Sequence, residues 1–238
     1  MASQFAVYSV VTSKRFEPSP PDPEIEAEHI CFYAGAKPDA PGWRTVRFFP
    51  PEELCASRAS RIPKALPHYF LEEFEFSVYA DTSVAVTRDA SDFFSREMER
   101  KDIGLIRLPR QLDEEFARVA ERRYENLYTL RLQESEYRSS DIHPQLFPTY
   151  WGGLILRRHN ETSVKNFGER WMMNILRFSR RDQLSLPIAL REVPSDRLIF
   201  ISGNDEKSNL HRRLQGVPKE KEYVAGSELL SRISSGMN

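Results

Sequence analysis

The sequence has few of the features that mark secreted or membrane-spanning proteins. Only two cysteines, Cys31 and Cys55, occur in 238 residues, and neither has a partner at metal-ligand spacing. Small or apolar residues flank both, so we expect buried thiols in a reducing compartment rather than a disulfide. The N-terminus has no basic segment followed by a long apolar one, and no apolar run approaches the roughly 20 residues of a transmembrane helix. We therefore expect a cytoplasmic protein without a transmembrane segment, and leave open a peripheral contact with the membrane.

The sequence also lacks an excess of charge of either sign. Lys and Arg together number 34, against 35 Asp and Glu, which gives a formal net charge of -1. Proteins that bind nucleic acid through its phosphates usually present a broad basic surface, so we expect no nucleic-acid partner. The hydrophobic content of 40% is that of an ordinary globular protein, and 238 residues are enough to bury a full core.

Strand-like and helix-like segments alternate along the chain. The strand-like runs cover 5–11, 29–33, 43–48, 76–80, 103–108 and 198–202, and a further one follows the glycine pair at 152–153. Helical periodicity covers 52–71 with interruptions, 89 to about 101, 111–137 and 162–178, and another helix starts near 187. This alternation predicts an α/β fold with a mixed, largely parallel sheet flanked by helices. Residues 203–238 are polar and weakly periodic, and we expect them to extend a core of residues 1–202.

An acidic residue follows one of the predicted strands directly. The run 76–80 ends at Asp81, which is followed by the small polar residues Thr82 and Ser83. In open α/β sheets, ligands bind outside the carboxyl ends of the strands, so an acid at that point is suited to a metal and to the phosphates bound to it. Asp81 and Ser83 are therefore candidate metal ligands. The alternative is that Asp81 only begins a turn.

Basic residues precede this strand at helical spacing. Arg58, Arg61, Lys64 and His68 are separated by three, three and four residues, which places them on one helical face except where Pro63 and Pro67 interrupt it. Such a face near the carboxyl edge of the sheet suits a diphosphate. A solvated helix face is the alternative, because Arg and Lys are exposed by default.

A second candidate binding segment combines aromatic residues and glycines. Tyr150 and Trp151 offer flat faces for a sugar, and Gly152 and Gly153 permit close approach of the backbone to a ligand. The same glycine pair is also typical of a tight turn or a β-bulge.

Three groups of residues together resemble the motifs of one family. They are similar, in the same order, to those of the glycosyltransferase-like domain family found in bacterial polysaccharide loci and in plant proteins linked to mucilage polysaccharide synthesis. The likeness covers most of the first 190 or so residues. It is carried by R-A-S-R at 58–61 with P-K at 63–64, P-H at 67–68 and Y-A-D at 79–81, by L-R-R-H-N at 156–160, and by R-R-D-Q-L-S at 180–185.

The resemblance implies a GT-A-like nucleotide-sugar-binding sandwich formed by residues 1–238 as a single domain. In that fold a D-x-D-like element, here Asp81-Thr82-Ser83, holds Mn²⁺ or Mg²⁺ and the diphosphate of the donor. The implied activity is transfer of a sugar from a nucleoside-diphosphate sugar, with a UDP-sugar favoured, to a hydroxyl of a glycan or lipid-linked acceptor. The protein would then serve polysaccharide or glycan synthesis.

The resemblance also suggests roles for residues of the later motifs. The pair Asp182 and Gln183 is similar to an Asp-Gln pair of retaining galactosyltransferases of the glycogenin type, which makes both residues catalytic candidates. Arg158 and His159 would bind phosphate or acceptor, and Arg181 would join Trp151 and Gly152 in the nucleotide-sugar site. The alternative for Asp182 is a cap at the N-terminus of the helix that follows.

Two departures from the family pattern keep other functions open. The loop after the first strand reads S-K-R-F-E-P-S-P-P instead of carrying glycine and tyrosine, and Ala34 stands where the family tends to have an acid. A non-catalytic nucleotide- or carbohydrate-binding module of a larger assembly is therefore the alternative function. A metal-dependent hydrolase is a weaker alternative, because no H-x-x-x-H or paired-acid spacing supports it.

Overall fold

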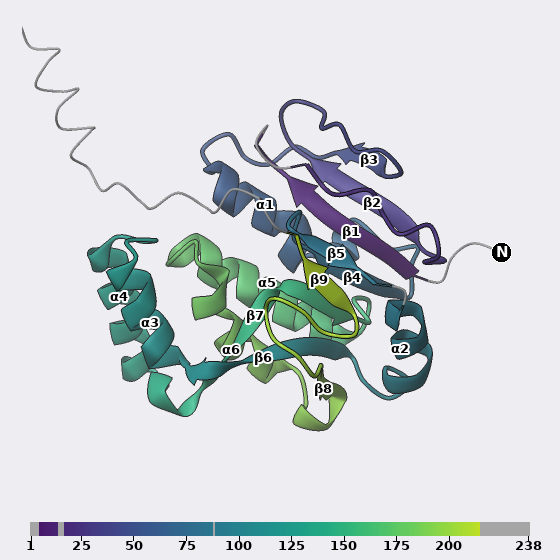
Figure 1. The fold of residues 1–238 in the computed structure, drawn as a ribbon. Helices are drawn as coiled ribbons and strands as arrows, with labels where there is room; N and C mark the ends of the chain where they lie inside the picture. The colour runs from purple at the N-terminus through teal and green to yellow at the C-terminus, as the bar shows by residue number, and fades with distance from the viewer. Residues whose placement is uncertain (1–4, 14–16, 88, 215–238) are drawn as a thin grey trace, which may run out of the picture.

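The computed structural model describes residues 5–13, 17–87 and 89–214 of the chain (Figure 1). The strands that it contains are β1 (Phe5–Val11), β2 (Glu28–Tyr33), β3 (Arg44–Arg47), β4 (Phe76–Ala80), β5 (Val84–Val86), β6 (Ile103–Gln111), β7 (Pro148–Arg157), β8 (Leu198–Phe200) and β9 (His211–Arg213). The helices are α1 (Ala56–Ala65), α2 (Asp89–Glu97), α3 (Leu112–Glu121), α4 (Leu127–Ser139), α5 (Thr162–Arg177) and α6 (Leu186–Ala189). Short 3₁₀ turns cover 67–69, 144–146, 182–184, 190–192 and 195–197.

Seven of the strands form one sheet, in the order β3-β2-β1-β4-β7-β6-β8. Strands β1 to β4 pair in parallel, and β8 is parallel to β6. Strand β7 runs antiparallel to both of its neighbours, β4 and β6. The predicted α/β class with a mixed, largely parallel sheet is thus confirmed, and the start of β7 lies at the edge where β4 ends.

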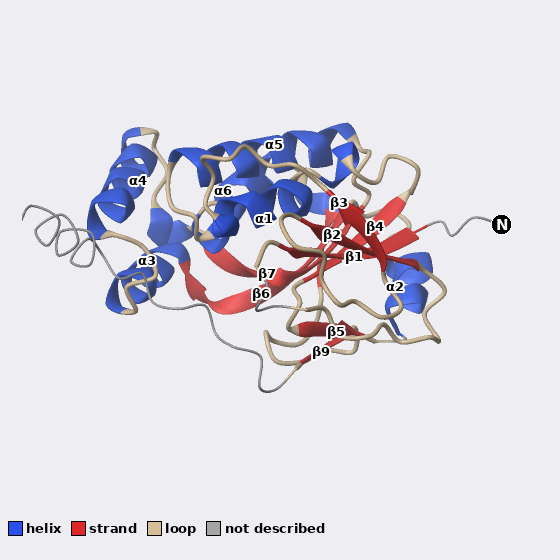
Figure 2. Ribbon diagram, turned by 90° about the horizontal axis from the view of Figure 1, so that it is seen from above, coloured by secondary structure: helices blue, strands red, loops and turns tan. Residues whose placement is uncertain are grey.

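The main sheet is covered on both faces. Helices α1, α5 and α6 lie on one face, and α2 with the small β5–β9 sheet lies on the other (Figure 2). Neighbouring residues of one strand enter different cores: Tyr8 packs with Trp171 on the helix side, and Val7 packs with Val78 on the other side. Burial on both faces explains why these strands read as continuous apolar runs. Within the described residues, no helix has the length and apolar character needed to cross a membrane.

The predicted helix 111–137 is wrong as a single element, because the chain breaks between α3 and α4. Arg123 adopts a positive φ of 52°, and the Tyr124 amide donates a hydrogen bond to the Val119 carbonyl at 3.0 Å. Asn126 then caps α4 by accepting a hydrogen bond from the Thr129 amide at 2.7 Å. The sequence around this turn is rich in helix-forming residues, so helical periodicity did not predict the break.

Two smaller expectations also need correction. Cys31 is buried as expected, but Cys55 is exposed directly before α1, and both thiols are free. The predicted extension 203–238 contributes the unpredicted strand β9, which pairs antiparallel with β5. The remainder of that extension, 215–238, and residues 14–16 of the loop after β1 lie outside the described residues.

Helices α1 and α5 pack with unusually little space between them. A Cβ atom added to Gly168 on α5 would lie 2.3 Å from the Ala65 carbonyl oxygen on α1. Arg58 strengthens the same contact, since its Nε donates to the Ile175 carbonyl at 3.0 Å and its Nη2 to the Phe178 carbonyl at 2.7 Å. The two helices are therefore held at a fixed separation by backbone contact and by side-chain capping of α5.

Replacement of Gly168 by alanine should lower the free energy of unfolding by about 1–3 kcal/mol, because the new methyl group meets backbone that cannot move aside. This loss should appear despite the better helix propensity of alanine, which is worth about 1 kcal/mol. Urea denaturation measures it. Met173→Ala is the control on the same helix, because Met173 is 53% exposed and its replacement should change stability by less than about 0.5 kcal/mol. Equal stability of the two variants would contradict the close contact.

Candidate active site

A cleft of about 880 Å³ opens at the carboxyl edge of the parallel strands. It is lined by the end of β1, by α1, by the turn after β4, by the start of β7 and by the 182–184 turn. Among the residues predicted for the site, those that line the cleft are Arg61, Lys64, Asp81, Ser83, Trp151, Gly152, Arg181, Asp182 and Gln183. The structure thus brings nine of the predicted residues together in one cleft, whereas Arg58, His68, Arg158 and His159 lie elsewhere.

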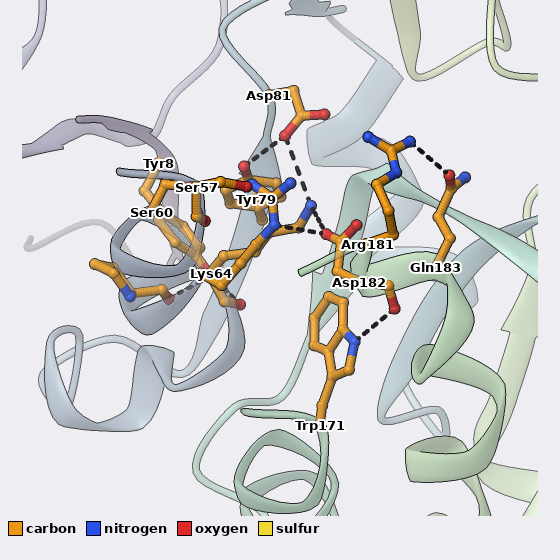
Figure 3. A network of polar contacts seen from close by, with 12 residues as sticks. Tyr8, Ser57, Ser60, Lys64, Tyr79, Asp81, Trp171, Arg181, Asp182 and Gln183 are labelled. Atoms are coloured by element: carbon orange, nitrogen blue, oxygen red, sulfur yellow. Dashed lines mark hydrogen bonds and ion pairs between the residues drawn. The ribbon is translucent and has the colours of Figure 1, made fainter. Parts of the chain in front are cut away.

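Lys64 occupies the floor of the cleft. Its ammonium nitrogen lies 2.6 Å from Oδ2 of Asp182 and 3.7 Å from Oδ1 of Asp81, so it is shared by two carboxylates (Figure 3). The same nitrogen lies 4.7 Å from the centre of the Tyr79 ring and 5.7 Å from that of Trp171. Only 2% of the side chain is exposed. Carboxylates and aromatic faces therefore surround a buried cation.

Asp182 is the most strongly held carboxylate of the cleft. Its Oδ2 also lies 3.1 Å from Nε of Arg61, and its backbone oxygen accepts a hydrogen bond from the Trp171 indole at 3.0 Å. Burial by itself raises the pKa of Asp182, but the cations Arg61, Lys64 and Arg181 outweigh burial and hold that pKa well below its ordinary value. Asp182 is therefore ionised throughout the physiological range.

The capping alternative for Asp182 does not describe this arrangement. Ser185 is the residue that precedes the following helix α6, Arg181 precedes the 182–184 turn, and neither element has a side-chain cap. The carboxylate of Asp182 points instead toward Lys64 on α1, as Figure 3 shows, and it also contacts Arg61 on the same helix. Its backbone carbonyl, which accepts from the Ser185 hydroxyl and the Ser185 amide, fixes the local turn.

Asp81 lies at the end of β4, at the rim of the cleft. Its Oδ1 accepts a hydrogen bond from the Tyr79 hydroxyl at 2.5 Å, and its amide donates to the Gly153 carbonyl at 2.9 Å. A backbone turn does begin here, because the Val84 amide donates to the Asp81 carbonyl at 2.8 Å. The turn is closed by backbone atoms, and the Asp81 side chain is 38% exposed, so it remains accessible to a ligand.

The glycine pair of β7 forms a bulge, one of the two structural alternatives for it. The pairing of β6 with β7 shifts register between Leu105, opposite Ile155, and Ile106, opposite Trp151. A Cβ atom on Gly152 would lie 3.2 Å from Nζ of Lys64, and one on Gly153 would lie 2.3 Å from the Trp151 ring. The bulge thus brings bare backbone against the ion pair of Lys64 and Asp182 and leaves room for the folded-back indole of Trp151.

The aromatic faces predicted to receive a sugar are already in contact with protein. Trp151 packs against the His211 imidazole at 4.7 Å between ring centres, and Tyr150 stacks on Phe200 at 5.7 Å. Trp151 still lines the cleft, whereas Tyr150 does not. Any sugar contact by Trp151 is therefore with the part of the indole that faces the cleft.

A group of arginines lies on the opposite side of the cleft from β1. We call it the arginine wall, and it consists of Arg110, Arg118, Arg122 and Arg181. Of these four, the sequence pointed only to Arg181. Glu115, fully buried, accepts from Arg110 at 2.9 Å and from both Nε and Nη2 of Arg118. Charged helical runs such as D-E-E at 113–115 are normally solvated, and only the (i, i+3) spacing of Glu115 and Arg118 hints at the ion pair in the sequence.

The Tyr124 ring lies next to two guanidinium groups of the arginine wall. The guanidinium carbon of Arg181 lies 4.7 Å from the centre of the Tyr124 ring, and that of Arg118 lies 5.9 Å from it. Arg181 also donates from Nη2 to the Gln183 side-chain oxygen at 3.4 Å. Among the described lining residues, seven basic side chains face four acidic ones, so the cleft carries an excess of positive charge.

Arg58 and His68 do not line the cleft, although both were predicted to bind nucleotide sugar. Arg58 caps the end of α5 through the two carbonyl contacts given above. His68 is buried with its Nε2 3.8 Å from Glu169 on α5. The break of α1 before Pro67 turns His68 away from Lys64, because the 67–69 turn does not continue the helical face.

Arg158 and His159 lie at the opposite edge of the sheet from the cleft. Because β7 is antiparallel to β4, its last residue Arg157 pairs with Ser77 near the start of β4. Arg158 donates to Glu75 at 2.5 Å and to the Met98 carbonyl, and His159 donates from Nε2 to the Leu71 carbonyl at 2.7 Å. We therefore leave both out of the proposed site; their contacts hold loops together.

Burial lowers the pKa of His159 to about 4, despite the hydrogen bond to Leu71 that favours the protonated ring. The unfolded chain takes up this proton near pH 6.5, so protonation favours unfolding as the pH falls from about 6.5 to about 4. His159→Gln keeps a donor for Leu71 but does not titrate. Between pH 7 and pH 4 the wild type should lose up to about 3 kcal/mol more stability than this variant.

Urea denaturation at a series of pH values measures this difference. All other residues are the same in both proteins, so the difference between the two curves isolates His159. Above pH 7 the two curves should run parallel. Parallel curves down to pH 4 would show that His159 is not held neutral by burial.

The residues around Asp81 do not fit the divalent metal that the D-x-D-like element implies. Among the described residues, no three His, Cys, Asp or Glu side chains converge on a point. Asp81 offers one carboxylate, of which Oδ1 already accepts from Tyr79. The other carboxylate of the cleft floor, Asp182, is occupied by Lys64 and Arg61. A hydroxyl such as that of Ser83 is a weak neutral ligand and does not replace a second free carboxylate.

No protein family and no curated protein matches the sequence, so the resemblance to the polysaccharide and mucilage family stays a prediction. Solved structures with a similar arrangement include the mannosyltransferase Ktr4p from S. cerevisiae, at 10% identity and a TM-score of 0.49 over 95% of this chain and 78% of that one. The galactosyltransferase LgtC, solved with donor and acceptor sugar analogues, is 9% identical with a TM-score of 0.47 over 96% and 95%.

A third similar structure is the bifunctional glycosyltransferase WbbM, at 11% identity and a TM-score of 0.43 over 82% of this chain. The chain spans 38% of the length of that protein. All three proteins are glycosyltransferases. At this level of similarity we build the functional proposal on the cleft's own residues.

Proposed function

We propose that the protein is a glycosyltransferase that moves a sugar from a nucleoside-diphosphate donor to a hydroxyl acceptor in polysaccharide or glycan synthesis. The observation that carries the proposal is the ionised, buried Asp182 in the floor of a basic cleft at the carboxyl edge of the sheet. A carboxylate held ionised beside arginines suits a reaction in which an anion departs and positive charge develops on the sugar.

The nucleoside of the donor would lie on the β1 side of the cleft. Thr12 and Ser13 follow β1, and Ser57 at the start of α1 lines the cleft with them, so a nucleoside there would lie against small polar side chains. A diphosphate beyond them would meet Arg61 and, across the cleft, Arg181. A UDP-sugar is our favoured donor.

In the proposed reaction the bond between the anomeric carbon and the diphosphate oxygen breaks with both electrons leaving on the diphosphate. The acceptor hydroxyl oxygen forms the new bond to that carbon, and its proton passes to the departing diphosphate. Asp182 would stabilise the positive charge that develops on the sugar, and Arg61 and Arg181 would stabilise the negative charge on the leaving group. Gln183, held by Arg181, would orient a sugar hydroxyl.

The acceptor would enter beside Tyr124 and the arginine wall. This side of the cleft lies opposite the proposed nucleoside position, and Trp151 extends it with an apolar surface. A glycan could place a ring against the accessible indole edge and hydroxyls on the arginines. A lipid-linked acceptor would place its phosphate on the same arginines.

The proposal is tested by calorimetry with UDP and GDP, followed by a panel of UDP- and GDP-sugars in which release of the diphosphate is measured. Binding of one nucleotide with release from its sugars is the expected result. Binding without release or transfer under any condition would favour the alternative of a non-catalytic nucleotide- or carbohydrate-binding module. No binding of any nucleotide at millimolar concentration would overturn both.

Asp182→Asn should lower turnover by roughly a hundredfold or more, because it removes a charge needed mainly in the transition state. The affinity for the nucleoside diphosphate should not weaken, since a negative charge beside the phosphates is lost. The variant also leaves Lys64 and Arg61 poorly paired, which costs roughly 3–5 kcal/mol of stability. Rates must therefore be compared below the melting temperature of the variant.

Asp141→Asn is the matched control, because its side chain is 95% exposed and lies outside the cleft lining. It should keep wild-type turnover and stability. Near wild-type turnover in Asp182→Asn, with a working donor and acceptor, would leave Asp182 as a purely structural residue.

A further inference from the structure

We infer that this cleft binds its nucleoside diphosphate without a divalent metal, with Lys64 and Arg61 supplying the positive charge that a metal would bring. The inference rests on the proposed function and concerns the electrostatics of the same site. Its starting point is the disagreement between the metal that the D-x-D-like element implies and the residues that surround Asp81.

Lys64 lies where a metal shared by the two carboxylates would have to lie. Its ammonium is 2.6 Å from Asp182 and 3.7 Å from Asp81, and the Tyr79 and Trp171 rings cover it from other directions. A dication in the same gap would meet the ammonium at short range and be repelled. The gap between the two carboxylates is thus filled by the ammonium group of Lys64.

Arg61 supplies a second positive charge beside Asp182, at the surface of the cleft. Its Nε reaches Oδ2 of Asp182 at 3.1 Å, and 15% of its side chain remains exposed to the cleft. One carboxylate oxygen of Asp182 therefore faces two cations, of which Lys64 is shared with Asp81. Against these two carboxylates the two basic residues carry the same charge as one dication, and the planar guanidinium of Arg61 suits phosphate oxygens.

The other residues of the cleft lining also favour the binding of a diphosphate without a metal. Seven basic side chains against four acidic ones line the cleft among the residues that the structure describes. Gly152 adds no side chain between the ligand space and the ion pair, because even a Cβ there would lie 3.2 Å from the Lys64 nitrogen. A bound diphosphate can therefore approach the two cations across bare backbone.

The decisive experiment uses the wild-type protein. Calorimetry measures the Kd for UDP and for GDP after treatment with EDTA, and again with Mg²⁺ or Mn²⁺ at millimolar concentration. The expected Kd for the nucleotide that binds is the same within twofold in chelator and in metal. A Kd at least tenfold tighter with metal would overturn the inference while leaving the proposed transferase intact. Absence of binding under every condition would overturn the proposed function, and the inference with it.

A second measurement addresses the two cations. Arg61→Met should weaken binding of the diphosphate in EDTA at least tenfold, while binding of the nucleoside without phosphates should change less than twofold. Lys165→Met, on the first turns of α5 and outside the cleft lining, is the matched control and should leave both affinities unchanged. An equal loss for nucleoside and diphosphate, or no loss for either, would show that Arg61 does not meet the phosphates.

Arg61→Met removes one of the two partners of Asp182, so its fold must be checked by thermal melting before binding is measured. If it does not fold, Arg61→Lys keeps a charge near Asp182 but loses the planar fork. The lysine variant should then show the selective loss for the diphosphate, and retention of wild-type affinity would count against Arg61.

Discussion

The ion pair between Lys64 and Asp182 joins two parts of the chain that are 118 residues apart, and the shape of the cleft depends on it. A buried ion pair of this kind gains little stability over apolar packing, because both charges lose their water. Its partners are nevertheless fixed, since removal of one charge leaves the other buried without compensation. The pair therefore acts as a positional constraint that holds α1 against the 182–184 turn.

Several other features follow from that constraint. The bulge at Gly152 and Gly153 is needed because a regular strand with side chains would press on the ammonium and on the indole of Trp151. Trp171 supports the pair from the core by donating to the Asp182 carbonyl. The close contact of Gly168 with α1 keeps α1 and α5 near enough for this arrangement. Stability and function thus draw on the same few contacts, which is common where a site is held by a rigid scaffold.

The sequence predicted which residues lie in the cleft when their positions depended only on spacing within one helix or strand. Arg61 and Lys64, one helical turn apart, do share a face, and Asp81 does end a buried strand. The positions of Arg158 and His159 could not be read in this way, because nothing local to β7 shows that it runs antiparallel to β4. The burial of Glu115 could not be predicted for a similar reason. An acid in a charged helical run is normally solvated, and only tertiary packing buries this one between two arginines.

Strand β7 runs from the cleft to the opposite edge of the sheet. Its start carries Trp151 and Gly152 into the cleft, and its end delivers Asn160 to the far edge, where the side chain donates to the Glu72 and Phe74 carbonyls. At about 3.3 Å per residue, Trp151 in the cleft and Arg157 at the end of β7 lie roughly 20 Å apart. Loops at the far edge are therefore a suitable place to tether the protein to a support or to a second domain. A molecule attached there would present its cleft to the surrounding solution, with the sheet itself acting as the spacer.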